Sequence, residues 1–313
     1  MKKHKDDRVK IEKISSRLMS DVVKKNMYNY GREVAEDRVL QAFRDGLKPS
    51  QRRILWAMND LHAYADGKTH KCARITGQAM GVYHPHGSSG LYSALVGMVT
   101  SNCPVVYGQG NFGSLTDDAA ADRYTEAKVS KLGMKMFECN EVAEFVPNYT
   151  GETKEPVILP TRIPLYLMNG GSGIGVGLLC RMPSHNLKEI VEALKYVVKK
   201  GEASTIKGIM KRMPGPEYQF GGRILSDEKQ IRQLYKNGKG SVEYSCDYHF
   251  EENKNGLLVI IDGCCPDFSP TNFLLAMAKL VEQGIVQRVN DATDKDKGFR
   301  LEVEIKTHSI FEK

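Results

Sequence analysis

The sequence predicts an α+β protein with more than one domain, and three observations lead to that prediction. Its 313 residues, of which 41% are hydrophobic, are enough to build two packed domains. Apolar residues in the first hundred positions recur at three- and four-residue spacing, which is typical of helices. After residue 220 short apolar runs that favour strands alternate with a helical pattern, so both sheet and helix are expected there.

Charge and composition limit the classes of protein to consider. The formal net charge of +7 suits a partner rich in phosphate, although many basic proteins bind no nucleic acid. The seven cysteines are spread widely and form no CxxC pair, which argues against a zinc site or disulfide framework and favours a cytoplasmic location. The amino terminus is charged and no apolar run reaches membrane-spanning length, so no membrane association is expected.

Residues 1–30 are predicted to form a basic arm followed by a helix. The first five residues include three lysines and a histidine, and they are expected to be a solvated tail. Apolar residues then recur at helical spacing on a face that must pack against another surface: Ile11, Ile14, Leu18 and Val22.

A turn and a further helix are predicted between residues 36 and 61. Asp45-Gly46 is a turn signal, and Pro49 suits the first turn of a helix. Cations gather around this turn, namely Arg38, Arg44, Lys48, Arg52 and Arg53. Because the amino terminus of a helix attracts anions, the cluster is consistent with phosphate binding. A solvated charged surface explains it equally well at this stage.

A helix-turn-helix is predicted over residues 70–100. Its first helix would span residues 72–81, and its second would run from Ser88 to about Thr100. The outer side of the second helix is made of small residues: Ser89, Ser93 and Gly97. Such a face can lie against a DNA groove, although it would also suit packing against another segment. His84 and His86 in the connection suggest contacts with an anion.

The segment Gly108-Gln-Gly-Asn-Phe-Gly113 matches the GxGxxG pattern of dinucleotide-binding proteins. That pattern requires a preceding strand and a helix that opens at its third glycine. Here a turn-like sequence follows and no βαβ unit surrounds it, so a nucleotide-binding oxidoreductase is rejected. A tight loop that leads to Arg123-Tyr124 is predicted instead.

Arg123 and Tyr124 are the strongest candidates for chemistry. A phenol with a pKa of about 10 is a poor nucleophile at neutral pH, but a neighbouring guanidinium favours the phenolate and binds phosphate. Tyrosine activated in this way can act as a covalent nucleophile. The simpler interpretation is an ordinary surface pair that opens a helix whose apolar side is Ala127, Leu132 and Met136.

Residues 155–180 combine a turn signal with closely spaced glycines. Asn169-Gly170 is predicted to form a hairpin turn. The glycines at positions 171, 173, 175 and 177 would let another backbone approach closely. Ile174 lies among them and is either a core residue, which is the default, or an exposed apolar wedge.

The rest of the chain is predicted to be an α/β region without an evident catalytic cluster. Helices are expected at residues 186–200 and 271–283, and strands near residues 222–226, 240–244, 257–261 and 301–305. Asp294 and Asp296 form a DxD pattern within a charged run, which is interpreted as a hairpin turn.

In their order along the chain, these segments resemble the A-type polypeptide of bacterial-type type IIA DNA topoisomerases, the family of DNA gyrase and topoisomerase IV. The resemblance covers residues 36–177, continues more weakly to the end, and leaves open which of the two activities applies and whether the source is viral. It rests on Arg44-Asp-Gly-Leu-Lys-Pro49, Tyr83-His-Pro-His-Gly87, Gly108-Gln-Gly-Asn-Phe-Gly-Ser114, Ala119-Ala-Ala121 with Arg123-Tyr-Thr-Glu126, and Ser172-Gly-Ile174.

The resemblance implies a domain arrangement. Residues 1–30 would be the arm and helix, residues 31–152 a winged-helix breakage-reunion domain, and residues 153–313 an α/β tower domain. The coiled coil and exit gate of the family are expected to be absent from these 313 residues.

The resemblance also assigns roles to individual residues. Tyr124 would attack a backbone phosphate and become joined to a DNA 5′ end, while Arg123 helps to hold that phosphate. Four further residues match family positions at the cleavage site: Arg38, Lys48, His84 and His86. Other DNA contacts are expected from Arg44, Arg52, Arg53, Arg74, Ser89, Ser93, Gln109 and Ile174, the last as a wedge that bends the duplex.

Partners and cofactors follow from the same resemblance. The expected partners are double-stranded DNA, a second copy of the chain at the DNA gate, and a B-type subunit with ATPase and TOPRIM domains in an A2B2 assembly. Mg²⁺ and ATP are both expected on that partner, and no metal site is expected here because no acidic cluster is evident. The alternative is a DNA-binding scaffold protein without the chemistry, against which the retained Arg123-Tyr124 argues.

Overall fold

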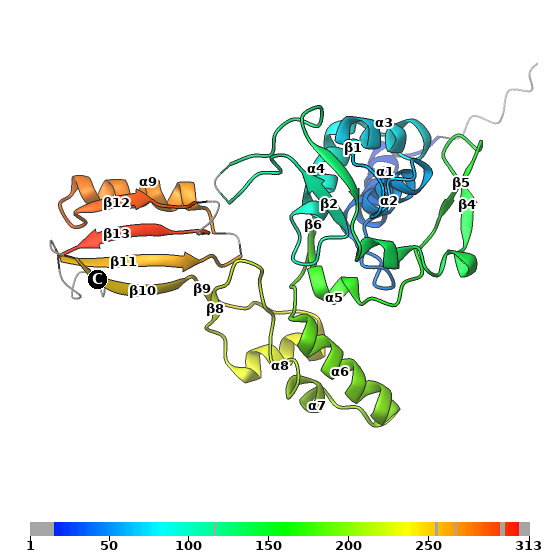
Figure 1. Ribbon diagram of the computed structural model, residues 1–313. Coiled ribbons are helices and arrows are strands. Elements are labelled where there is room, and N and C mark those ends of the chain that lie inside the picture. Colours follow the sequence, from blue (N-terminus) through cyan, green and yellow to red (C-terminus); the bar gives the residue numbers. More distant parts are fainter. Residues whose placement is uncertain (1–15, 116, 254–255, 267, 295–297, 307–313) are drawn as a thin grey trace, which may run out of the picture.

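The computed structural model describes residues 16–115, 117–253, 256–266, 268–294 and 298–306. Helices and strands are mixed throughout these residues, which confirms the predicted α+β class. Figure 1 shows a larger lobe built from the first half of the chain, a sheet-containing lobe at the opposite end, and a small helical unit along the chain between them.

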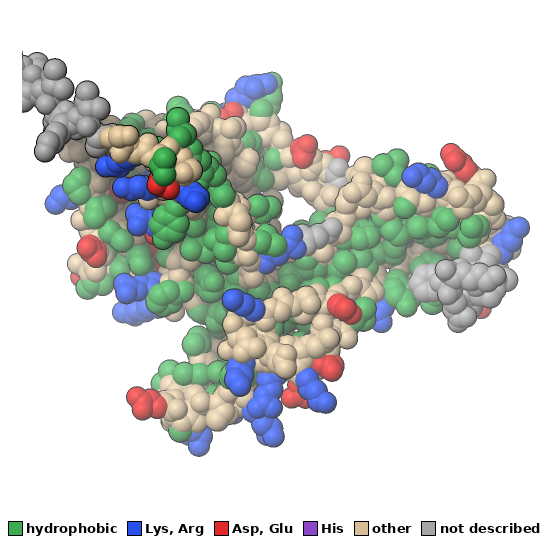
Figure 2. All heavy atoms as spheres, turned by 180° about the vertical axis from the view of Figure 1, so that it is seen from behind, with side chains coloured by type: hydrophobic (Ala, Val, Ile, Leu, Met, Phe, Trp, Pro, Cys, Tyr) green, Lys and Arg blue, Asp and Glu red, His purple; other side chains and the backbone are tan. Residues whose placement is uncertain are grey.

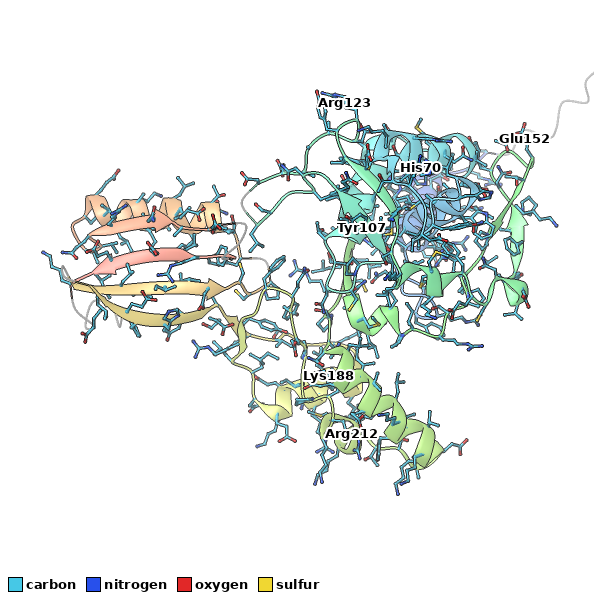
Figure 3. The ribbon with its side chains drawn as sticks, in the orientation of Figure 1. His70, Tyr107, Arg123, Glu152, Lys188 and Arg212 are labelled. Atoms are coloured by element: carbon cyan, nitrogen blue, oxygen red, sulfur yellow. The ribbon has the colours of Figure 1, made fainter. Side chains whose placement is uncertain are left out.

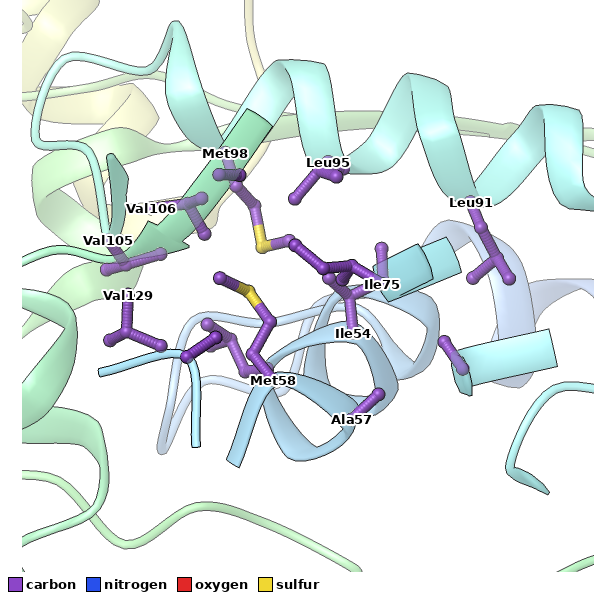
Figure 4. Close-up of a cluster of buried hydrophobic side chains, with 14 of the residues drawn as sticks. Ile54, Ala57, Met58, Ile75, Leu91, Leu95, Met98, Val105, Val106 and Val129 are labelled. Carbon is purple, nitrogen blue, oxygen red and sulfur yellow. The ribbon is translucent and has the colours of Figure 1, made fainter. Parts of the chain in front are cut away.

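Three helices form the centre of the first lobe, and all three were predicted. They are α2 (Pro49–Asp60), α3 (Cys72–Val82) and α4 (Ser88–Val99). At the start of α2 the Lys48 N–H donates to the Gln51 side-chain oxygen at 2.9 Å, which satisfies a donor that the helix itself leaves unpaired. The helices share one apolar core (Figure 4), whose fully buried members include Ile54, Leu55, Met58, Ile75, Leu91 and Leu95.

A three-stranded antiparallel sheet in the order β1-β3-β2 completes this core. Its strands are β1 (His70–Lys71), β2 (Val106–Gln109) and β3 (Glu126–Val129). The predicted helix after Arg123-Tyr124 is therefore wrong, because Ala127 and Val129 point into the core with a period of two residues. No helix opens at Gly113, which agrees with the rejection of a dinucleotide site.

The helix predicted near the amino terminus is α1 (Met19–Val34), and it continues into the π-helical turn η1 (Ala35–Val39). It begins later than the apolar pattern indicated, and Ile11 and Ile14 lie outside the described residues, as does the basic arm. None of the residues of α1 is buried.

A glycine-rich hairpin follows the short strands β4 (Phe145–Pro147) and β5 (Lys154–Pro156) and the short helix α5 (Leu165–Asn169). Its strands are β6 (Gly171–Gly175) and β7 (Leu178–Met182), so the chain reverses at Val176-Gly177, where Gly177 has φ +67°. The hairpin turn predicted at Asn169-Gly170 is wrong, since that pair joins α5 to β6.

The reason lies in a distant contact of the Asn169 side chain. Its oxygen accepts from the Cys103 N–H at 2.7 Å, and its amide donates to the Cys103 carbonyl at 2.9 Å. The prediction of close backbone approach is confirmed, because a Cβ on Gly173 would lie 2.4 Å from the Val39 carbonyl oxygen.

The small helical unit contains α6 (Leu187–Lys200), α7 (Ile206–Met210) and α8 (Glu228–Asn237). The start of α6 is fixed by Asn186, whose side chain accepts from the Lys188 N–H at 2.9 Å. Two short strands, β8 (Arg223–Ile224) and β9 (Tyr244–Ser245), pair beside it near the predicted positions. Helices α7 and α8 were not predicted.

The last lobe is a four-stranded antiparallel sheet with the order β10-β11-β13-β12 and one helix. Its strands β11 (Gly256–Gly263) and β13 (Leu301–Ile305) and its helix α9 (Pro270–Glu282) were predicted, whereas β10 (Asp247–Asn253) and β12 (Arg288–Asp291) were not. Asp294 pairs with Gly298 in an isolated bridge, and Asp296 lies outside the described residues. No helix in the described ranges is long and apolar enough to cross a bilayer.

Candidate functional site

Tyr124 lies at the end of the loop that connects β2 to β3, and its side chain is 66% exposed. The guanidinium carbon of Arg123 is 4.6 Å from the centroid of the Tyr124 ring. Figure 3 shows Arg123 at the outer tip of this loop, directed away from the rest of the lobe. The loop therefore presents a phenol and a fixed cation side by side to solvent.

Backbone hydrogen bonds fix the loop on both sides of Tyr124. The Cys72 N–H donates to the Thr125 carbonyl at 3.0 Å, and the Ala73 N–H donates to the Asp122 carbonyl at 3.2 Å. Cys72 is the first residue of α3, so these bonds join the loop to the start of that helix. Because Thr125 is completely buried while Tyr124 is exposed, the phenol stands on a fixed backbone.

Tyr92 provides a second anchor from α4. Its hydroxyl donates to the Ala120 carbonyl and lies 2.9 Å from the Thr125 Oγ1. Burial raises the pKa of Tyr92, so this hydroxyl stays protonated and keeps its hydrogen bond at neutral pH. The loop that holds Tyr124 is thus attached to both helices of the predicted helix-turn-helix.

A second group of site residues surrounds His84. Arg53 forms a bidentate pair with Glu155, with N–O distances of 2.8 and 2.9 Å, and its third nitrogen lies 3.4 Å from His84 Nδ1. The rings of His84 and His86 are 5.1 Å apart. Burial and the nearby charges of Arg53, His86 and Arg38 lower the pKa of His84 to about 4. His84 is therefore neutral at neutral pH, in a place where an anion would be attracted.

A third group joins Lys48 to the glycine-rich hairpin. The Lys48 ammonium donates to the Ser172 carbonyl at 2.5 Å, and the Gln41 amide donates to the Gly170 carbonyl at 3.1 Å. Burial lowers the pKa of Lys48, an effect that Cys180 partly opposes. Ile174 on this hairpin is 79% exposed, so the interpretation of Ile174 as a core residue is wrong.

Arg52 is not placed to contact DNA as expected. Its side chain is 6% exposed and binds the fully buried Asp45 through two nitrogens at 2.7 and 2.9 Å. The Asp45 carboxylate also accepts from the backbone N–H groups of Leu47 and Leu159, both at 3.0 Å. Arg52 therefore stabilises the turn before α2.

The other expected DNA contacts lie on the surface of the first lobe. Arg44 is exposed beside Phe43, and Arg74 is exposed on α3 with a nitrogen 3.2 Å from His70 Nδ1. Ser89 and Ser93 are exposed on α4, and Gln109 is exposed on β2. Figure 2, a view from behind, shows Lys and Arg side chains gathered over this lobe.

The hydrogen bonds and ion pairs of the described residues keep these groups separate. They form one group around Tyr124, one around His84 and one between Lys48 and the hairpin. Within the same described ranges, no set of three or more His, Cys, Asp or Glu side chains is arranged to hold a metal ion. Mg²⁺ therefore has no fitting donor set among them, and no step is derived through such an ion.

Three functional residues were missed from the sequence. Asp45 was interpreted only as part of a turn, although an acid beside a cluster of five cations could have suggested a buried partner. Glu155 is 102 residues from Arg53, and Tyr92 is 28 residues from Ala120. Nothing local in the sequence indicates those two contacts.

Comparison with known proteins gives a consistent family. Residues 38–313 match the family model for the GyrA-type polypeptide of DNA gyrase/topoisomerase IV. The chain is 37% identical over 303 residues to the DNA gyrase A polypeptide of Campylobacter fetus, which covers 94% of this chain and 35% of that protein. It is 38% identical over 308 residues to the same polypeptide of Chlamydia pneumoniae, covering 95% and 37% respectively. The chain thus spans little more than a third of the length of these relatives.

Proposed function

This chain belongs to the family of DNA gyrase and topoisomerase IV A-type polypeptides, and on that premise we propose that it cleaves and rejoins duplex DNA in a type IIA topoisomerase. One observation supports this function most directly. Tyr124 is exposed beside the Arg123 guanidinium, on a loop that hydrogen bonds fix to α3 and α4. An exposed phenol on a fixed backbone is suited to attack a large substrate such as DNA.

The proposed reaction is a transesterification. The Tyr124 Oη attacks a backbone phosphorus, the bond from that phosphorus to the sugar 3′ oxygen breaks, and the phenol proton ends on the released 3′ hydroxyl. The DNA 5′ phosphate is then esterified to Tyr124, and the reverse attack by the 3′ hydroxyl rejoins the strand. Arg123, 4.6 Å from the ring, favours the phenolate and stabilises the charge on the phosphate.

The groups around His84 and Lys48 would bind further phosphates of the same duplex. Arg38, Arg53 and Lys48 provide fixed positive charge, and neutral His84 and His86 can donate or accept hydrogen bonds. The surface residues Arg44, Arg74, Ser89, Ser93 and Gln109 remain proposed DNA contacts. Ile174 is proposed as the apolar wedge that enters a base step and bends the duplex.

The finer domain assignment is part of the same proposal. Helices α2–α4 with the sheet β1-β3-β2 would be the winged-helix domain within residues 31–152, and residues 153–313 would be the tower. A second copy of the chain at the DNA gate and a B-type subunit that supplies ATP hydrolysis and Mg²⁺ are the proposed partners in a cytoplasmic A2B2 assembly. This part rests on the family relationship.

The test is covalent trapping of DNA. The purified chain is incubated with a B-type subunit, Mg²⁺ and supercoiled DNA, stopped with detergent, and assayed for protein-linked DNA. Tyr124→Phe removes only the hydroxyl, so DNA binding and unfolding temperature are expected to match the wild type while covalent DNA disappears. Tyr149→Phe, another half-exposed tyrosine of the same lobe, serves as the matched control. Covalent DNA at wild-type yield in Tyr124→Phe would contradict the assignment.

A DNA-binding scaffold without chemistry is the second candidate. It predicts tight binding to DNA with no covalent product in any variant. The exposure of Tyr124 and the guanidinium beside its ring favour the cleaving function over this candidate.

A further inference from the structure

A groove of about 710 Å³ lies on the outer face of the sheet β1-β3-β2, beside the loop that holds Tyr124. Its walls include Lys68, Tyr107, Gln109, Lys128 and Lys131. Figure 3 shows Tyr107 in the same lobe as Arg123, below the loop that Arg123 ends. None of these residues except Gln109 has a place in the proposed cleavage chemistry.

Strand alternation places the groove and the nucleophile on one continuous surface. Gln109 pairs with Glu126 and Tyr107 with Lys128, so these four side chains share the outer face of the sheet. Ala127 and Val129 occupy the opposite face and are buried. Tyr124 precedes Glu126 by two residues and therefore lies at the end of the same outer surface.

The groove is positively charged because its single acid is already neutralised. Glu126 binds the Lys71 ammonium at 2.9 Å and accepts from the Thr69 hydroxyl at 2.5 Å. Lys128 is held in place by the carbonyls of Ala65 and Gly67 at 2.7 and 2.9 Å, which leave its positive charge uncompensated. Lys68 and Lys131 are exposed, and no carboxylate pairs with them among the described ion pairs.

The dimensions match the backbone of a duplex. Four extended residues separate Tyr124 from Lys128, a span of roughly 13 Å at about 3.3 Å per residue. Phosphates along one strand advance about 3.4 Å per base pair, so the groove lies about four base pairs from the phosphate that Tyr124 would attack. An exposed aromatic ring, an amide and three ammonium groups suit a sugar-phosphate chain.

We propose that this groove binds the phosphate backbone of the DNA that flanks the cleaved phosphate, an inference that rests on the proposed function. Lys68 and Lys131 make the phosphate contacts, Lys128 fixes the shape and charge of the wall, and Tyr107 packs against a sugar. The groove thereby fixes the direction in which the duplex leaves Tyr124. An acidic surface of a partner protein is the competing occupant, and the experiment distinguishes the two.

The main test is the salt dependence of DNA binding. Affinity of the 313-residue chain for a duplex of about 30 base pairs is measured over a range of salt concentrations. Each phosphate contact contributes about 0.9 to the slope of log affinity against log salt concentration. Lys68→Ala/Lys131→Ala is therefore expected to reduce the slope by about 1.8. Lys68→Arg/Lys131→Arg keeps both charges and is expected to restore the wild-type slope.

A matched control removes two lysines elsewhere. Lys135 and Lys195 are also exposed, but each is paired with a nearby glutamate, Glu138 and Glu192 respectively. Lys135→Ala/Lys195→Ala changes the net charge equally and is expected to leave the slope unchanged. A loss of slope in this control equal to that of the groove variant would show that net charge alone explains the effect, which overturns the proposal.

A second measurement tests the position of the contact. Single phosphates of the duplex are replaced by neutral methylphosphonates, counted from the phosphate at which the Tyr124 adduct forms. In the wild type, neutralising the phosphates about three to five positions away is expected to weaken binding, and in Lys68→Ala/Lys131→Ala the same replacements cost nothing further. Additive losses would overturn the assignment of these lysines to the flank.

The outcomes separate this inference from the proposed function. If Tyr124-dependent covalent DNA forms but the groove variant keeps the wild-type slope, the groove proposal alone is wrong. If the groove variant instead loses affinity for the B-type subunit while its DNA slope is unchanged, the groove binds protein and the proposal is overturned. If no Tyr124-dependent adduct forms, the proposed function fails, whatever the slopes are.

Discussion

The lobe that contains Tyr124 and the lobe that contains the four-stranded sheet are packed very differently. The first has a single core of twenty-one buried apolar residues contributed by its three helices, its sheet and adjoining loops. The last has five such residues between its sheet and α9, and Pro270 is the only buried residue described in that helix. A cavity of about 810 Å³ lies between α9 and the sheet, and Figure 2 shows apolar side chains across that lobe.

This difference teaches where positional precision is needed. Every proposed chemical group, including Tyr124, His84 and Lys48, is attached to the well-packed lobe or to the hairpin bound to it. Dense packing fixes these groups because a close-packed core resists small displacements. The described part of the sheet lobe contains none of them, and its thin core is compatible with a role in which exact atomic positions matter less.

The largest effect is expected from breaking the buried ion pair of the first lobe. Asp45→Asn keeps the shape of the side chain but leaves the Arg52 guanidinium buried without its counter-charge. Removing one partner of a buried pair costs about 3–5 kcal/mol, so a large loss in the free energy of unfolding is expected. Urea unfolding followed by Trp56, the single tryptophan, measures this lobe directly.

The matched control for that variant is Glu138→Gln. Glu138 pairs with Lys135 in the same lobe, but both side chains are largely exposed, so a loss below about 1 kcal/mol is expected. Equal losses in the two variants would mean that burial does not decide the strength of these pairs.

Two methionines compare the cores of the two lobes. Met58 is completely buried in the first core, whereas Met277 is only partly buried and borders the cavity under α9. Met58→Ala is expected to cost about 2–5 kcal/mol, while Met277→Ala should cost less than about 2 kcal/mol. Urea unfolding monitored by Trp56 fluorescence and by far-ultraviolet circular dichroism measures both. A greater loss for Met277→Ala would refute the difference in packing.

The pH dependence of the first lobe should report on His84. The pKa of His84 is about 4 in the folded chain against about 6.5 when unfolded. As the pH falls from about 6.5 towards 4 the unfolded state takes up a proton that the folded state does not, so stability decreases over this range. His84→Gln is expected to reduce that decrease, measured by urea unfolding on both sides of this range, at about pH 7.5 and about pH 4.5.

The same histidine should respond to DNA. A phosphate beside His84 favours its charged form, so DNA binding is expected to raise its pKa, which NMR titration of the imidazole protons follows. An unchanged pKa in saturating DNA would place the phosphates away from this group.

The smallest effect on stability is expected at Ile174, on the rim of the first lobe. Because its side chain is 79% exposed, Ile174→Ala should change the free energy of unfolding by less than about 0.5 kcal/mol. DNA bending, measured by energy transfer between the duplex ends, is nevertheless expected to decrease. Val198→Ala on α6, another exposed apolar residue, should leave bending unchanged. Reduced stability with normal bending would contradict the wedge.

Local patterns predicted much of the fold. Helices α2, α3, α4, α6 and α9 lie close to where apolar periodicity placed them, because the spacing that buries one face of a helix is written in consecutive residues. The strand β3 was missed as an alternative to a helix, since only four residues show its alternation. The turn at Asn169-Gly170 was misplaced because the side chain of Asn169 is bound to Cys103, 66 residues away.

The candidate site divides in the same way. The sequence by itself determined that Arg123 stands beside Tyr124, since covalent neighbours need no fold to bring them together. The tertiary structure alone decided what becomes of Arg52 and Arg53, which are adjacent cations on one helix. Successive residues of a helix point about 100° apart, so the two side chains face different surroundings. Arg52 meets Asp45 in the buried turn, while Arg53 meets Glu155 and His84 on the surface, because segments distant in the chain pack against those two faces.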